Sequence, residues 1–210
     1  MNCVGVMGTG IAYEHRLRYP EMFLKYKAIC DAKNLNIGNL WIYKEKEKWI
    51  LNFPTKYHWK YDSKPEFLEK GLLKFINTYK EKGITSIAFP LLGAHNGGIS
   101  KTESLEIMKK HLNQCDIPIE IYHYDSNATD DLFPLLKKIW NTTSEKLLVQ
   151  KTNIRLNLIR EIKLKIERNE INNLSSLIKL KGFGEKSLEN IFQFIINFED
   201  NNQASLFDSE

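Results

Sequence analysis

Long apolar runs are absent from this sequence of 210 residues. The best candidate, residues 84–93, is shorter than the roughly 18 apolar residues that a membrane span requires, and Thr85, Ser86 and Pro90 interrupt it. The amino-terminal residues also lack the basic segment followed by an apolar segment that marks a secretory signal. These absences predict a cytoplasmic protein with no membrane partner.

Cysteine is scarce, and nucleotide-binding signatures are missing. Cys3, Cys30 and Cys115 are odd in number, far apart and outside any Cys-x-x-Cys pattern, which argues against a disulfide framework and against a cysteine zinc site. No glycine-rich stretch carries the Gly-Lys-Ser/Thr of a Walker A loop. We therefore expect reduced thiols and neither a metal nor a cofactor.

Charge is distributed unevenly, although the net charge is only +4. Residues 146–186 carry ten Lys or Arg against four acidic residues, whereas the last 24 residues carry five acids and no base. A basic block favours a polyanionic partner, but a solvated charged helix explains it equally well. The 42% of hydrophobic and 11% of aromatic residues are enough to bury a core.

The first 125 residues alternate short apolar runs with amphipathic stretches. Residues 49–53, 86–89 and 117–122 have the composition of strands, and residues 66–79 and 102–112 carry apolar side chains at helical spacing. This alternation predicts a mixed or parallel α/β sheet that is covered on both faces. Ligands of such sheets bind in the loops beyond the strand ends.

The pattern becomes helical further along the chain. Residues 147–171 place apolar side chains at steps of four with basic residues between them. We therefore predict an α/β domain over residues 1–140, a small all-α module over residues 147–198 and a disordered acidic tail over residues 199–210.

Two glycine-rich loops each precede a predicted helix. The first is Asn2-Cys-Val-Gly-Val-Met-Gly-Thr-Gly-Ile-Ala12, and the second is Pro90-Leu-Leu-Gly-Ala-His-Asn-Gly-Gly-Ile99. Glycines allow close approach of the backbone, and N–H groups at a helix start suit phosphate oxygens. A pair of such loops in one small domain predicts a diphosphate site. Between them, Asn52-Phe-Pro-Thr-Lys-Tyr-His-Trp59 follows a predicted strand.

These motifs together resemble the macro domain, an ADP-ribose-binding fold, over roughly residues 1–125. Within that family they are most similar to DNA ADP-ribosyl glycohydrolase antitoxins of the DarG type, through the two glycine loops, Tyr-Pro-Glu-Met-Phe at 19–23 and Asn-Phe-Pro-Thr-Lys-x-His-Trp. The resemblance implies a three-layer α/β/α sheet. The sequence begins directly at the first glycine motif, whereas macro domains normally have one or two strands before it. Either the start codon was assigned too late, or the sheet lacks its first strands and its adenine contact is lost or replaced.

The resemblance also implies an activity, the removal of ADP-ribose from thymine bases in DNA by an N-glycosyl hydrolase. It assigns catalysis to Lys56, whose amine can attack or protonate at the anomeric carbon, and to Asn2, beside the distal ribose. The alternative is that Lys56 only binds phosphate or faces solvent, and the motif favours catalysis. The ADP-ribose contacts that the resemblance implies are Gly5, Val6, Met7, Gly8, Thr9, Gly10, Ile11, Pro54, Thr55, Leu92, Gly93, Ala94, His95, Asn96, Gly97, Gly98 and Tyr122.

Two further segments predict nucleic-acid and protein partners. Residues 174–191 resemble a helix-hairpin-helix motif, in which backbone N–H groups of Gly182 and Gly184, with Lys181 and Lys186, hold a DNA phosphate. A hairpin that only stabilises the domain is the alternative. The segment Gln203-Ala-Ser-Leu-Phe207 resembles the short peptide with which bacterial proteins bind the replication sliding clamp.

Three functions are consistent with these motifs. The first is a hydrolase that releases ADP-ribose from nucleic acid and takes ADP-ribose or ADP-ribosylated DNA as its ligand. The second is a non-catalytic reader of ADP-ribosylated DNA in repair or replication. The third is a neutralising partner of a cognate ADP-ribosyltransferase toxin, bound through the basic helical region. Retention of the lysine motif favours the hydrolase.

Overall fold

The computed structural model describes residues 1–45 and 48–207, with side chains through Phe198. The chain divides into two compact units, which we call unit 1 (Met1–Tyr124) and unit 2 (Asp125–Glu210). The division comes before the boundary predicted at residue 140. Residues 125–140 therefore belong with the helical part, in which Trp140 Nε1 donates a hydrogen bond to the carbonyl of Ile159.

Unit 1 contains two pairs of short strands. Strand β1 (Trp41–Lys44) is antiparallel to β2 (Trp49–Asn52), and β3 (Ile87–Pro90) is parallel to β4 (Ile119–Tyr122). The strands predicted at 49–53, 86–89 and 117–122 are therefore present, whereas β1 was not predicted. Among the described residues the two pairs form separate two-stranded sheets. The continuous middle sheet predicted for the three-layer α/β/α fold is therefore not formed.

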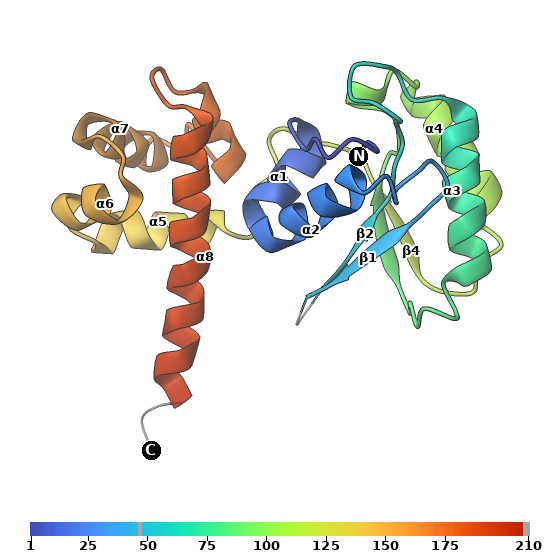
Figure 1. Cartoon of the computed structure of the whole chain (residues 1–210). Helices are drawn as coiled ribbons and strands as arrows, with labels where there is room; N and C mark the ends of the chain where they lie inside the picture. Colours follow the sequence, from blue (N-terminus) through green and yellow to red (C-terminus); the bar gives the residue numbers. More distant parts are fainter. Residues whose placement is uncertain (46–47, 208–210) are drawn as a thin grey trace. The chain divides into compact units, whose positions relative to one another are not determined.

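Helices lie on both sides of these strands. Figure 1 shows α1 and α2 on one side and α3 and α4 on the other. Local sequence explains several of the starts: α2 and α3 each begin at a proline, which is favourable at the first helical position, and Ser100 Oγ accepts a hydrogen bond from Glu103 N at the start of α4. The helices are α1 (Gly10–Arg18), α2 (Pro20–Asp31), α3 (Pro65–Thr78), the 3₁₀ turn η1 (His95–Gly97) and α4 (Lys101–Leu112).

Each side of unit 1 has its own hydrophobic core. The smaller cluster joins α2 to β1 and to Met7 of the first glycine loop; its buried members are Met7, Met22, Tyr26, Cys30, Leu35 and Tyr43. The larger cluster joins α3, α4 and β3; its buried members are Phe53, Leu68, Leu72, Phe75, Tyr79, Phe89, Leu92, Ile99, Met108 and Leu112. The two cores and the strands between them give unit 1 an α/β/α arrangement.

The α3 helix packs unusually closely on Phe53. A Cβ atom on Gly71 would overlap the Phe53 ring and lie 2.5 Å from its Cε1 atom. Only glycine permits this approach. Because Phe53 is buried and immediately precedes the Pro-Thr-Lys sequence, the contact fixes the start of that segment.

The regular secondary structure of unit 2, in its described residues, consists of helices joined by turns and loops. Its core is formed by apolar faces of the helices, with Leu136, Ile162, Leu188 and Phe192 all buried. In the part of the chain that the structure describes, no helix is both long and apolar enough to cross a membrane. The elements are α5 (Phe133–Thr142), α6 (Glu145–Thr152), α7 (Leu156–Glu167), the 3₁₀ segment η2 (Leu174–Lys179) and α8 (Glu185–Phe207).

The segment that resembles a helix-hairpin-helix forms η2, a turn and the start of α8. Gly182 has φ +81°, and Gly182, Gly184, Lys181 and Lys186 are exposed. The first arm is a 3₁₀ segment rather than an α-helix. Helix α8 continues to Phe207, so the backbone of residues 199–207 is helical where a disordered tail was predicted. The side chains of the clamp-like peptide, and residues 208–210 altogether, lie outside the described residues.

Candidate functional site

The first glycine loop, residues 2–10, is organised by the side chain of Asn2. Its Oδ1 accepts hydrogen bonds from the backbone N–H groups of Val4 and Val6, at 3.0 and 3.3 Å, and its Nδ2 donates to Val6 O at 2.6 Å. Asn2 is buried, and both polar atoms of its amide are bonded within the loop. The interaction that the structure gives to Asn2 is therefore one that shapes the loop.

Tyr26 of α2 holds Asn2 in place through its hydroxyl group. Its hydroxyl donates to Asn2 O at 2.7 Å and lies 3.1 Å from Asn2 Oδ1. Burial raises the pKa of Tyr26 far above its usual range, so the hydroxyl stays protonated and keeps donating. The sequence did not identify Tyr26, because nothing about a tyrosine at helical spacing indicates that its hydroxyl bonds to the first glycine loop.

The Phe-Pro-Thr-Lys segment continues from β2 and is bonded to the start of the first loop. Thr55 N donates to Met1 O at 2.9 Å, and Cys3 N donates to Tyr57 O at 3.0 Å. Pro54 and Thr55 are buried, whereas Lys56 is partly exposed. These backbone bonds place Lys56 beside the first loop.

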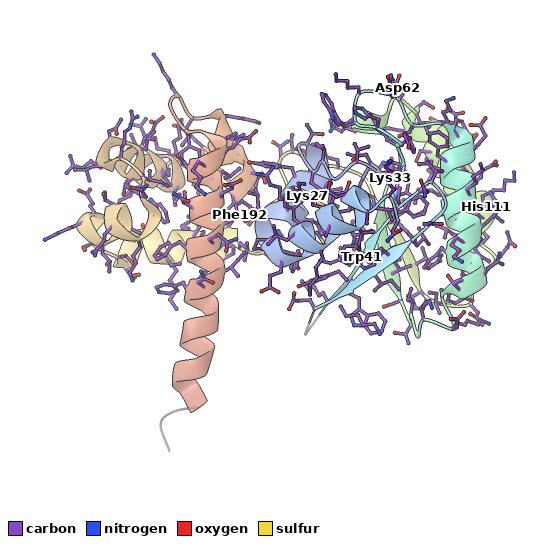
Figure 2. All side chains as sticks on the ribbon, viewed as in Figure 1. Lys27, Lys33, Trp41, Asp62, His111 and Phe192 are labelled. Carbon is purple, nitrogen blue, oxygen red and sulfur yellow. The ribbon has the colours of Figure 1, made fainter. Side chains whose placement is uncertain are left out.

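The second glycine loop, residues 93–98, connects β3 to α4. Gly93 and Gly98 have φ +66° and +85°, and a Cβ atom on Gly98 would lie 2.7 Å from the carboxyl carbon of Asp62. Ser63 N donates to Gly97 O at 2.7 Å. Asp62, which is labelled in Figure 2, and Ser63 come from the segment between Lys56 and α3. Sequence reasoning missed both of these residues.

The three segments meet at Asn96. Lys56 Nζ donates to Asn96 O at 2.5 Å. From the other side, a Cβ atom on Gly10 would lie 3.2 Å from Asn96 Nδ2, so the end of the first loop also touches Asn96. The structure thus brings together the two glycine loops and the lysine that the sequence singled out.

The other predicted ligand contacts divide by exposure. Met7 and Leu92 are buried in the two cores, so only their backbones remain for a ligand. His95 has φ +62° and places its ring edge-on to Tyr124, with centroids 5.3 Å apart. Tyr122 ends β4 opposite Pro90, where β3 enters the second loop, and its hydroxyl donates to Glu120.

Cys3 adjoins the site, because its thiol donates to Lys56 O at 3.5 Å. Burial, and next the nearby Cys30, raise the pKa of Cys3 to about 11. Only thiolate reacts with iodoacetamide, so the alkylation rate of Cys3 in the native protein should rise about tenfold per unit between pH 7 and 9.5. In the unfolded protein it should level off above about pH 8.5. Peptide mass spectrometry measures both profiles; a native rate that levels off near pH 8.5 would contradict the raised pKa of the Cys3 thiol.

The sequence pattern of the Macro domain family matches residues 1–108, half of the chain. The chain belongs to the macro domain family. Its α/β unit is followed by an additional helical region, unit 2. Within the described residues, no group of three or more His, Cys, Asp or Glu side chains is placed to hold a metal ion.

Two relatives have DNA ADP-ribosyl glycohydrolase in their names. A Mycobacterium tuberculosis protein called DNA ADP-ribosyl glycohydrolase is 43% identical over 103 residues, which are 47% of this chain and 29% of the relative. A Thermosipho africanus DNA ADP-ribosyl transferase-DNA ADP-ribosyl glycohydrolase fusion protein is 32% identical over 141 residues, 58% of this chain and 36% of the relative. The chain thus spans about a third of the length of the curated relatives it matches.

Solved structures agree with this relationship. The macrodomain of M. tuberculosis DarG superposes with a TM-score of 0.57 at 37% identity, covering 60% of this chain and 86% of that one. T. africanus DarTG, solved in complex with ADP-ribose, gives a TM-score of 0.57 at 32% identity, covering 63% of this chain and 38% of that one. The macro domain of this chain is therefore of the DarG kind.

Proposed function

We propose that this chain is an ADP-ribosyl glycohydrolase that removes ADP-ribose from nucleic acid, with thymine-linked ADP-ribose in DNA as its substrate. The observation that carries the proposal is the position of Lys56 Nζ, bonded to Asn96 O at the meeting point of both glycine loops. The names of the DarG relatives support the choice of DNA as the modified molecule.

In this proposal, backbone N–H groups bind the diphosphate and the Lys56 side chain acts at the ribose. The backbone N–H groups of the two loops are suited to the diphosphate, since glycines let the backbone approach the oxygens closely. The bond to Asn96 O restrains the amino group of Lys56 at the side of the loops. Asn2, predicted to orient the distal ribose, contributes by holding the first loop in shape. Its effect on the ribose is therefore exerted through the loop.

The reaction exchanges one bond at the anomeric carbon of the distal ribose. The bond from that carbon to the thymine nitrogen breaks, a water oxygen replaces the nitrogen, and the nitrogen regains a proton. The Lys56 amino group can serve either by attacking the carbon, which gives a covalent adduct that water then releases, or by donating the proton in its ammonium form. Both routes return an unmodified thymine and free ADP-ribose.

Unit 2 supplies the proposed grip on the DNA backbone. Exposed Lys181 and Lys186 flank the exposed turn at Gly182 and Gly184, as a phosphate-binding hairpin requires. Lys186 Nζ lies 3.3 Å from Glu189 Oε2, at an exposed position where a phosphate can compete for the lysine. We also propose a cognate ADP-ribosyltransferase toxin as a partner, because one relative is a fusion of the two activities.

A single-turnover assay tests the proposal directly. The full chain is incubated with a single-stranded oligonucleotide that carries ADP-ribose on one thymine, and the products are followed by gel shift and mass spectrometry. We expect the oligonucleotide to lose the mass of ADP-ribose and the free nucleotide to appear. Binding of ADP-ribose without any release would contradict the hydrolase and favour the non-catalytic reader.

A further inference from the structure

Four aromatic side chains directly follow Lys56, and we call residues 57–61 the aromatic loop. Tyr57, Trp59 and Tyr61 are exposed over 59%, 50% and 68% of their surface. The fourth ring, that of His58, lies between the others in the sequence. Several large exposed aromatics on one short loop mark a binding surface more often than chance exposure does.

The rings of the aromatic loop are already arranged against one another. His58 stacks on Trp59 with ring centroids 5.5 Å apart and an interplanar angle of 26°, and it lies 5.6 Å from the Tyr61 ring. The backbone supports this arrangement, since Tyr61 N donates to His58 O at 3.2 Å and Lys60 N donates to His58 Nδ1 at 3.2 Å. A ligand would therefore meet a preformed surface, which lowers the entropy cost of binding.

Both ends of the aromatic loop are tied to the glycine loops. At its start, Tyr57 O accepts from Cys3 N of the first loop. Just beyond its end, Ser63 N donates to Gly97 O of the second loop, and Asp62 lies against Gly98. The rings are thus held in a fixed position relative to Lys56 and Asn96, the meeting point of the site.

The charges around these rings fit a nucleic acid. Residues 56–64 contain three lysines and one acid, Asp62. Lys60 Nζ lies 5.3 Å from the centre of the Trp59 ring, and Lys64 lies 5.9 Å from that of Phe67. Lysine is depleted at protein–protein interfaces, whereas lysines beside exposed aromatics are the composition of single-strand binding surfaces. A surface groove with largely apolar walls runs beside the loop; its lining is Tyr57, Tyr61, Asp62, Lys64 and Phe67.

We propose that the aromatic loop is a stacking platform for the bases of single-stranded DNA next to the modified thymine. This inference rests on the proposed function, because it assigns the DNA side of the same site. Every base has a flat face, so stacking on Trp59 and Tyr61 recognises single strands without selecting their sequence. Lys60 adds attraction to the phosphates. The platform gives the enzyme affinity for the polymer as well as for ADP-ribose.

The test compares two ligands, free ADP-ribose and a fluorescein-labelled ten-nucleotide strand ADP-ribosylated at one central thymine. All proteins are full chains that also carry Lys56→Ala, so that ADP-ribose stays attached to the strand during the measurement. Unit 2 is identical in all of them and contributes equally to strand binding. Trp59→Ala and Tyr61→Ala should each weaken strand binding about tenfold or more, in line with the loss of one stacked base, and leave ADP-ribose binding within twofold. Fluorescence anisotropy and calorimetry measure the two affinities.

Trp49→Ala is the matched control. Trp49 is 46% exposed on β2 and carries Lys44 Nζ 3.8 Å above its ring, as Trp59 carries Lys60. It should bind both ligands like the parent protein. Equal strand affinities for parent, Trp59→Ala and Tyr61→Ala would overturn the platform, even where the wild type releases ADP-ribose. Loss of strand affinity in those variants supports the platform even if the wild type releases none.

Discussion

Replacing Lys56 by alanine should slow the release of ADP-ribose from thymine-modified DNA by about a hundredfold to ten-thousandfold, the range expected for losing a positioned acid, base or nucleophile. The physical reason is that Lys56 Nζ donates a hydrogen bond to Asn96 O of the second glycine loop, which holds its amino group at the proposed ADP-ribose site. Rapid-quench kinetics under single-turnover conditions measure the chemical step without contributions from product release.

A Lys56→Arg variant separates chemistry from charge. Arginine keeps a positive charge that can donate to Asn96 O, but it does not lose its proton in proteins and cannot act as the attacking amine. We expect Lys56→Arg to bind ADP-ribose but to remove ADP-ribose from the modified DNA nearly as slowly as Lys56→Ala does. Both variants should keep the circular dichroism spectrum of the parent. Release at the wild-type rate by Lys56→Ala would remove this residue from the mechanism.

The second large effect should come from Gly71→Ala in α3. Glycine to alanine within a helix usually stabilises by about 1 kcal/mol. Here the new methyl group would overlap the buried Phe53 ring, so the ring or the helix must move. We expect a net loss of about 1–3 kcal/mol or more, as for other overpacked cores, and a lower melting temperature for unit 1. Because Phe53 leads into Pro54, ADP-ribose release should fall as well.

A double variant tests this explanation. Phe53→Leu shortens the side chain and should cost a modest amount of stability alone. Combined with Gly71→Ala, it leaves room for the new methyl group and should recover most of the loss, which is a coupling between neighbouring residues. Calorimetry with and without ADP-ribose identifies the transition of unit 1, because ligand shifts only that one. A Gly71→Ala protein as stable as the parent would contradict the close approach of α3 and Phe53.

Periodicity located most elements of unit 1 but not its sheet. The strands with buried apolar residues and the helix over residues 66–79 were predictable because burial on one face leaves a repeat in the sequence. Strand β1 (Trp41–Lys44) was not predicted, although it has the same length as β2, with which it pairs. The separation into two strand pairs also left no trace, because pairing depends on partners distant in the chain.

The site was predictable as a set of motifs and not as a set of contacts. The glycine loops and Lys56 stand out by residue type, and the structure places them together. The bonds that hold them are mostly made by backbone atoms, as in the contact of Ser63 N with Gly97 O, and backbone bonds have no residue signature. For the same reason the sequence could not tell that the Asn2 amide is used within its own loop.

The hydrogen bonds around Lys56 join residues that are far apart in the chain, which affects when the site forms during folding. Residues 1–3 are held by residues 53–57, and Lys56 is held by Asn96, 40 positions further along. Closing such loops costs chain entropy before any contact repays it, so we expect the site to form late in folding, together with the rest of unit 1. A chain in which only the smaller core has formed should therefore lack the site, and we expect ADP-ribose binding only once unit 1 is complete.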